Sequence, residues 1–132
     1  MPHTTTIAIT TDTTLNLAYQ AFLTLQHPHY HAYAHARLAP ARAEEALHDT
    51  FDTLATHWTA LVCGTDLTAR AWDELTHQVQ TRTGRHRHPT RNTLQDDLEI
   101  LTELGYTPTH CADITGRDPA HIHALKAARQ RT

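Results

Sequence analysis

The sequence predicts an all-α protein in two parts, a helical bundle followed by a small helix-turn-helix unit. Apolar residues recur every three or four positions along most of the chain, which is the periodicity of an amphipathic helix. No stretch alternates apolar and polar residues as a half-buried strand does. The segment TGRHRHPTRN, at 83–92, has glycine, proline and arginines but no apolar residue, as a linker between two folded parts would.

The bundle is predicted to span residues 15–82, after a threonine-rich, unpatterned leader at residues 1–14. Its first helical region runs to residue 38 and is interrupted at Pro28, because an interior proline removes a backbone hydrogen bond. The apolar stripe of this region consists of Leu15, Ala18, Phe22, Leu25, Tyr30, Tyr33, Ala34 and Leu38.

The strongest helical pattern covers residues 43–62. Its apolar stripe, expected to face the other bundle helices, is Ala43, Leu47, Phe51, Leu54, Trp58 and Leu61. Gly64 is expected to end this helix, and the next helix, at 65–82, carries Trp72, Leu75 and Val79. Three helical regions with apolar faces are sufficient for a small bundle.

The second part, residues 94–132, begins with a short leucine-rich helix at 94–104 that Gly105 closes. Thr107–Pro108 and Asp118–Pro119 each place a good N-cap before a proline at the first helical position. Gly116 stands where the first of these helices needs a left-handed terminal residue. We therefore predict a helix at 108–115, a turn at 116–118 and a helix at 119–130, which together form a helix-turn-helix. The residues expected to pack between them are Ala112, Ile114, Ile122 and Leu125.

The charge is divided unevenly between the two parts, although the chain as a whole has a formal net charge of −3. Residues 1–80 contain three arginines against eight acidic residues (net −5), and residues 81–132 contain eight basic residues against six acidic ones (net +2). An acidic front and a basic back predict two surfaces with different partners. For the back, DNA is the expected partner, with phosphates supplying most of the affinity. Its candidate contact residues are Arg82, Arg85, Arg87, Arg91, Arg117, His121, His123, Lys126, Arg129 and Arg131.

Thirteen histidines and two cysteines raise the question of a metal site, and we expect none. His121 and His123 lie about 200° apart around one helix and do not converge. His31 and His35 are one helical turn apart, but the sequence shows no third ligand beside them, so they are expected to be solvated. Cys63 and Cys111 lack a CxxC spacing and are expected to be reduced, half-buried residues.

Two stretches together resemble the extracytoplasmic-function sigma factors, small promoter-specificity subunits of bacterial RNA polymerase. FLTLQHPHYHAYAHARLAPARAEEALHDTFDTLATHW (22–58) follows the rhythm of sigma region 2, and AEEALHDTF (43–51) stands where that family has an Ala-Glu-Asp…Glu-Thr-Phe stretch. Residues 107–129 resemble region 4, with family-typical residues at Ala112, Ile114, Gly116 and Ile122.

The resemblance implies a region 2-like bundle at 15–82, a basic linker at 83–93 and a region 4-like helix-turn-helix at 94–132. It implies that the helix containing 43–51 docks on the coiled coil of the polymerase β′ subunit and that the helix-turn-helix reads promoter DNA. On this sequence the docking residues would be Glu44, Glu45, His48, Asp49 and Asp52. An anti-sigma protein is a further partner that the resemblance suggests.

A second hypothesis stays open beside the sigma-like regulator. The chain would keep the sigma shape as an interaction module that binds polymerase, an anti-sigma protein or itself without reading promoters. The alanine-rich outer face of the last helix and the net charge favour this module, whereas the arginines of the linker favour the DNA-binding regulator.

The sequence argues against an enzyme, a cofactor and a membrane span. It contains no nucleophile elbow, phosphate loop or metalloprotease motif, and the exposed carboxylates of 43–52 are typical of a solvated helix face. No apolar run has the length of a membrane span. The N-terminus has no basic head followed by an apolar core, so we expect a cytoplasmic location.

Overall fold

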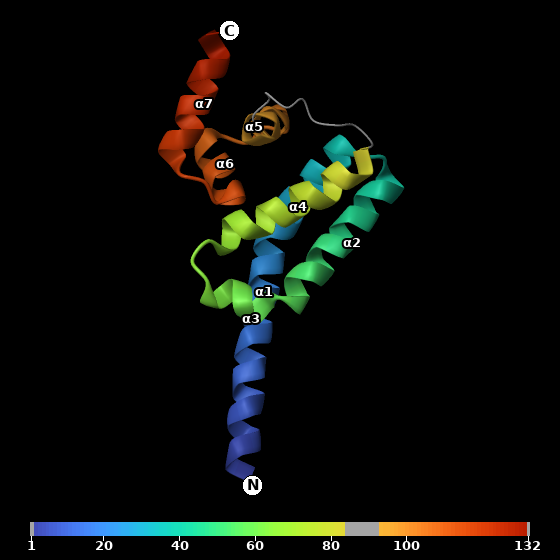
Figure 1. Ribbon diagram of the computed structural model, residues 1–132, viewed down its shortest axis with the longest axis vertical. Helices are drawn as coiled ribbons and strands as arrows, with labels where there is room; N and C mark the ends of the chain where they lie inside the picture. Colours follow the sequence, from blue (N-terminus) through green and yellow to red (C-terminus); the bar gives the residue numbers. More distant parts are fainter. Residues whose placement is uncertain (1, 84–92, 132) are drawn as a thin grey trace.

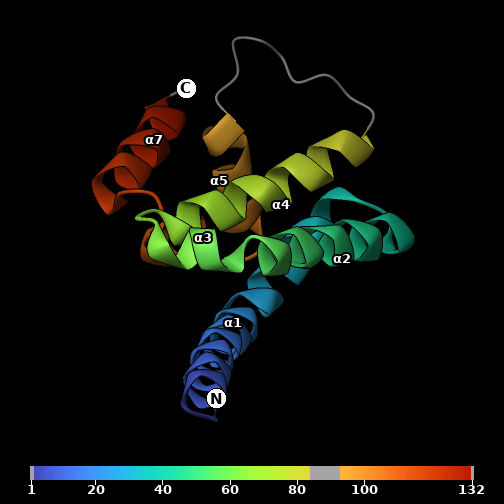
Figure 2. The same ribbon diagram turned by 60° about the horizontal axis from the view of Figure 1, so that its bottom comes forward.

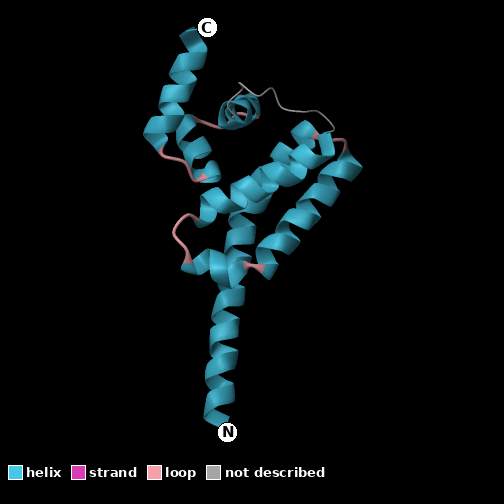
Figure 3. Ribbon diagram, in the orientation of Figure 1, coloured by secondary structure: helices cyan, strands magenta, loops and turns pink. Residues whose placement is uncertain are grey.

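Seven helices make up the described chain in the computed structural model (Figure 1), which describes the backbone of residues 2–83 and 93–131 and the side chains of 16–83 and 94–127. They are α1 (Pro2–Arg37), α2 (Pro40–Thr56), α3 (Trp58–Cys63), α4 (Leu67–Thr83), α5 (Thr93–Glu103), α6 (Pro108–Thr115) and α7 (Pro119–Arg131). These residues include no strand (Figure 3), which confirms the predicted all-α class. None of the helices in these ranges is both long and apolar enough to cross a membrane.

Helices α1, α2 and α4 form the bundle, with α2 and α4 packed side by side (Figure 2). The predicted stripe of α2 and α3 faces inward, since Leu47, Leu54 and Trp58 are all buried. Phe51 differs from the prediction because it is only partly buried, with its ring stacked on that of Tyr30. Most of the predicted stripe therefore forms core, and Phe51 lies at its margin.

Helix α1 is longer and less interrupted than predicted. It begins at Pro2, so residues 2–14 are helical where an unpatterned leader was expected, and it continues through Pro28. No glycine or proline lies between these two prolines, so no breaker residue ends the helix there. On the C-terminal side of Pro28, Tyr30, Tyr33 and Ala34 are fully buried. Their burial offsets the roughly 3 kcal/mol that an interior proline costs.

The predicted helix 43–62 is divided in two at His57, between α2 and α3. The backbone of His57 leaves helical geometry at φ −104° and ψ 16°, and Gly64 follows the end of α3 as predicted. The change of direction lets Trp58 pack its ring 5.3 Å from that of Tyr19 and 5.6 Å from that of Phe22, measured between centroids. The end of α2 therefore coincides with the contact between Trp58 and α1.

The two predicted parts share one hydrophobic core, to which all seven described helices contribute buried residues. A buried polar network also joins them. Asp97 of α5 accepts hydrogen bonds from the hydroxyl of Tyr33 (2.6 Å) and from the indole of Trp72 (3.2 Å). The guanidinium of Arg37 lies 4.0 Å from the same carboxylate and donates to the Tyr33 hydroxyl. The helices that follow the predicted linker are thus held against α1 and α4.

Candidate functional site

The helix-turn-helix forms where the sequence predicted it. The Thr107 hydroxyl accepts a hydrogen bond from the backbone amide of His110 (3.2 Å), and the Asp118 carboxylate accepts one from Ala120 (2.9 Å). These bonds satisfy amides that a helix start leaves without intrahelical partners. Gly116 ends α6 with φ +71°, the left-handed conformation that favours glycine. Local side-chain chemistry therefore sets both helix starts and the turn.

Packing against α4 fixes the orientation of this unit. A side chain at Gly116 would place its Cβ only 2.4 Å from the backbone nitrogen of Ala69 in α4, so the turn approaches α4 more closely than another residue would allow. Between α6 and α7, the predicted core residues Ala112, Ile114 and Ile122 are buried. Leu125 is partly exposed and packs against the same core. These contacts fix the orientation of α7 relative to α6.

The outward face of α7 is open to solvent. Ala120, His123 and Ala124 are exposed on this face, and His121 is exposed on another side of the helix. The methyl groups of the alanines offer apolar contact only, whereas each imidazole can donate or accept a hydrogen bond. Lys126 is partly buried on the same helix. The outward face of α7 is therefore exposed and carries few polar groups.

The predicted DNA-contacting basic residues fall into different situations. Arg117 forms an ion pair with Asp73 of α4 at 2.8 Å, and Arg82 forms ion pairs with Glu45 (3.2 Å) and Asp49 of α2. Both arginines therefore connect elements of the fold. The predicted contacts whose side chains lie outside the described residues are Arg85, Arg87, Arg91, Arg129 and Arg131.

The predicted polymerase-docking residues all lie on the outer side of α2, and the structure separates them into two groups. Glu45 and Asp49 share the guanidinium of Arg82, which partly neutralises them. The other three, Glu44, His48 and Asp52, line an open groove of about 380 Å³ between α1 and α2. Two of the four carboxylates on the predicted docking face of α2 are thus paired with an arginine.

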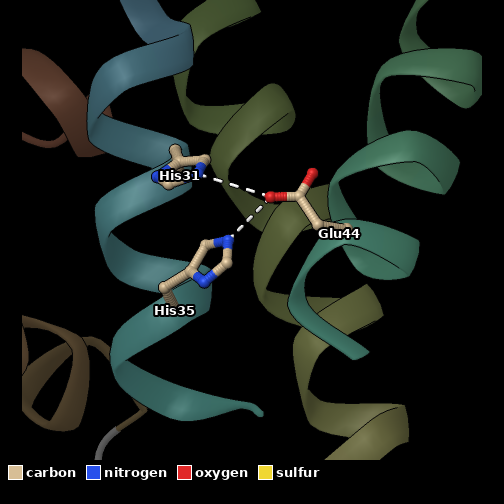
Figure 4. Close-up of side chains that lie close together, drawn as sticks. All are labelled: His31, His35 and Glu44. Carbon is tan, nitrogen blue, oxygen red and sulfur yellow. Dashed lines mark hydrogen bonds and ion pairs between the residues drawn. The ribbon is translucent and has the colours of Figure 1, made fainter. Parts of the chain in front are cut away.

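Beside the two histidines of α1 the structure places a carboxylate that the sequence did not show there. Nε2 of His35 lies 2.8 Å from Oε1 of Glu44, and Nε2 of His31 lies 3.4 Å from the same oxygen (Figure 4). The hydrogen bond with His35 is the main cause that lowers the pKa of the Glu44 carboxyl below its usual value. The sequence did not show this neighbour because Glu44 comes from the next helix, after the chain reverses at residues 38–39. The short connection before Pro40 was the available signal.

Asp97 is the other residue whose role the sequence did not reveal. It stands one position before Leu98 and four before Leu101, and both leucines are buried. The position of Asp97 beside this leucine stripe, at helical spacing from it, was the signal in the sequence that its carboxylate faces the core. Its burial is made possible by Tyr33 and Trp72, which are distant in sequence.

The two cysteines also differ from the expectation of two half-buried thiols. Cys111 is fully buried in α6, whereas Cys63 is exposed at the end of α3, and both are free. Burial raises the pKa of the Cys111 thiol, so this side chain acts as a small core residue.

Searches with protein-family models, among curated proteins and among solved structures each found no match to this chain.

Proposed function

We propose that this protein is a sigma-factor-like transcription regulator that contacts promoter DNA through α6 and α7 and RNA polymerase through α2. The observation that carries the proposal is the helix-turn-helix, whose second helix is fixed by packing while its outward face stays exposed. A helix presented in this way can enter a major groove without rearrangement of the fold.

On the DNA, His123 is the proposed base-edge contact, because it is exposed on the same side of the first turns of α7 as Ala120 and Ala124. His121 is also exposed but lies about 200° from it around the helix. The exposed alanines beside His123 suit the methyl group of thymine. Phosphate contacts are proposed for Arg129 and Arg131 and for the linker residues Arg85, Arg87 and Arg91. In contrast, Arg82 and Arg117 would first have to leave their carboxylate partners, so we assign them a structural role.

For polymerase, the proposed docking surface on α2 is the exposed pair His48 and Asp52, because Glu44 beside them pairs with His31 and His35 of α1. This surface is the part of the predicted docking helix that pairs neither with Arg82 nor with the histidines of α1. The β′ subunit coiled coil is the partner that the sigma resemblance implies. Asp52 is the best single position to test, because a charge reversal there leaves the ion pairs of Arg82 intact.

An interaction module that binds polymerase or an anti-sigma protein without reading DNA is the second candidate. A specific observation favours it: two of the three predicted DNA-contacting basic side chains that the structure describes, Arg82 and Arg117, are held in ion pairs. Fewer cations are then available for phosphates than the composition of the chain suggests. The two candidates differ in one measurable property, affinity for DNA.

Fluorescence anisotropy of short duplexes, at low and at physiological salt, tests the DNA contact. Binding should weaken with salt by a log–log slope of about −0.9 per phosphate neutralised. Arg129→Ala/Arg131→Ala should weaken all duplexes equally and reduce the slope by up to about 1.8. His121→Ala/His123→Ala should change the preference among duplexes, while His57→Ala/His77→Ala, which removes two exposed histidines elsewhere, should have no effect.

A pull-down with core RNA polymerase tests the other surface and separates the two candidates. Asp52→Lys should abolish capture, whereas Glu103→Lys, a reversal at an exposed position of α5, should not. Capture by polymerase without DNA binding at low salt would leave only the interaction module. Equal capture of both variants would exclude α2 as the docking helix.

A further inference from the structure

Three potential metal ligands converge between α1 and α2. His31 and His35 stand one turn apart on α1, which places both imidazoles on one face of the helix. Their rings lie 4.1 Å apart between centroids and are nearly parallel, at 29°. Glu44, in the second turn of α2, extends its carboxylate toward both rings (Figure 4).

The spacing of the donor atoms matches a metal centre. Oε1 of Glu44 lies 3.4 Å from Nε2 of His31 and 2.8 Å from Nε2 of His35, and one donor atom from each residue lies within 4.8 Å of the others. Bonds of about 2.0–2.1 Å to a tetrahedral zinc ion place neighbouring ligand atoms about 3.3–3.4 Å apart. The two separations between imidazole and carboxylate therefore lie within about 0.6 Å of those in a tetrahedral zinc site.

We propose that His31, His35 and Glu44 bind a zinc ion that joins α1 to α2. Two imidazoles and one carboxylate are a ligand set that zinc accepts, whereas calcium and magnesium require oxygen ligands throughout. The fourth position faces solvent, because the side chains of His31 and Glu44 are 46% and 61% exposed. His27, one turn earlier, is a neighbour and not a ligand, since its ring stacks on Phe51.

The same contacts have a simpler interpretation, in which the histidines only hydrogen-bond and pair with Glu44. The two interpretations differ in what zinc does to the protein. A zinc ion that bridges two helices binds the folded chain more tightly than the unfolded one and stabilises it. A hydrogen-bonded cluster without metal affinity leaves stability independent of zinc.

Isothermal titration calorimetry of zinc chloride into the full chain, in a non-chelating buffer at neutral pH, tests the site. We expect one ion per chain, and His31→Ala/His35→Ala should weaken binding at least about tenfold, a loss that even outer-shell substitutions around metals cause. Glu44→Gln, which keeps a hydrogen-bond acceptor but loses the charge, should also weaken it. His57→Ala/His77→Ala removes the same number of imidazoles, both of them exposed, away from the cluster and should bind zinc as the wild type does.

Thermal unfolding followed by circular dichroism supplies a second readout. Zinc should raise the melting temperature of the wild-type chain and of His57→Ala/His77→Ala but not that of His31→Ala/His35→Ala. Because the substituted side chains lie at the surface, both variants should keep the wild-type helical content. The site is refuted if the wild type binds no zinc, or if His31→Ala/His35→Ala binds it as tightly as the control pair. Unchanged affinity in Glu44→Gln would overturn the three-ligand site.

Discussion

Replacing Tyr33 with phenylalanine removes one hydroxyl group from the buried network that joins α1, α4 and α5. That hydroxyl donates a 2.6 Å hydrogen bond to the Asp97 carboxylate and accepts one of 2.9 Å from Arg37. Burial and the neighbouring carboxylate both raise the pKa of Tyr33, so the hydroxyl keeps its proton under all ordinary conditions. The substitution therefore deletes a donor from a buried carboxylate and leaves the packing of the ring unchanged.

The magnitude follows from the charge of the acceptor. A hydrogen bond to a charged group contributes about 1.5–3 kcal/mol to stability. Asp97 keeps the Trp72 indole at 3.2 Å and Arg37 at 4.0 Å, so we expect a loss of about 2 kcal/mol in the free energy of unfolding. For a chain of this length, each kcal/mol corresponds to about 3–5 °C, and the melting temperature should fall by about 6–10 °C.

Tyr30 provides a control of the same chemistry three residues away. Its ring is also fully buried, but its hydroxyl has no hydrogen-bond partner among the described residues. A buried hydroxyl without a partner opposes folding, so Tyr30→Phe should leave stability within about 0.5 kcal/mol of the wild type or raise it. Urea and thermal unfolding, monitored by circular dichroism, measure both variants. Equal losses in the two variants, or no loss in Tyr33→Phe, would refute the role of the network.

Three further predictions concern stability. Gly116→Ala should lower the free energy of unfolding by more than the roughly 1–2 kcal/mol of a left-handed alanine, because the new Cβ meets the backbone of α4. Gly105→Ala, at a position with φ +99° and open space around it, should lower it by less in the same urea titration. Equal losses in the two variants would contradict the close packing of Gly116 against α4. Phe51→Ala should cost about 2–3 kcal/mol, below the 3–5 kcal/mol typical of a fully buried ring, and an unchanged melting temperature would exclude its contact with the core. Burial, and secondarily the nearby His110, lower the pKa of His29, so the unfolded chain binds a proton at this residue first as the pH falls, and the associated stability is present above about pH 6.5 and lost below it. His29→Gln should therefore lose less stability than the wild type between about pH 7.5 and 5.5. Identical pH profiles of the two proteins would show that His29 does not contribute to the loss of stability in acid.

The sequence by itself determined the features that depend on neighbours along the chain. The all-α class follows from the spacing of apolar residues. The helix-turn-helix follows from two N-cap residues that each precede a proline, and from Gly116 at the turn. The hydrogen bonds of these residues span only two to four positions along the chain. Such contacts form whenever the local residues are present, so they can be inferred without knowledge of the fold. The proposed DNA and polymerase surfaces rest on this local pattern and on the sigma resemblance.

Only the tertiary structure decided which distant residues meet. Glu44 reaches the two histidines of α1, Asp97 lies 64 residues from Tyr33, and Arg82 lies 33 residues from Asp49. The same packing carries α1 through Pro28, against the local preference, because the residues beyond it are buried. These pairings depend on how helices are oriented against one another, which is set by burial summed over many side chains and not by the spacing of any single motif.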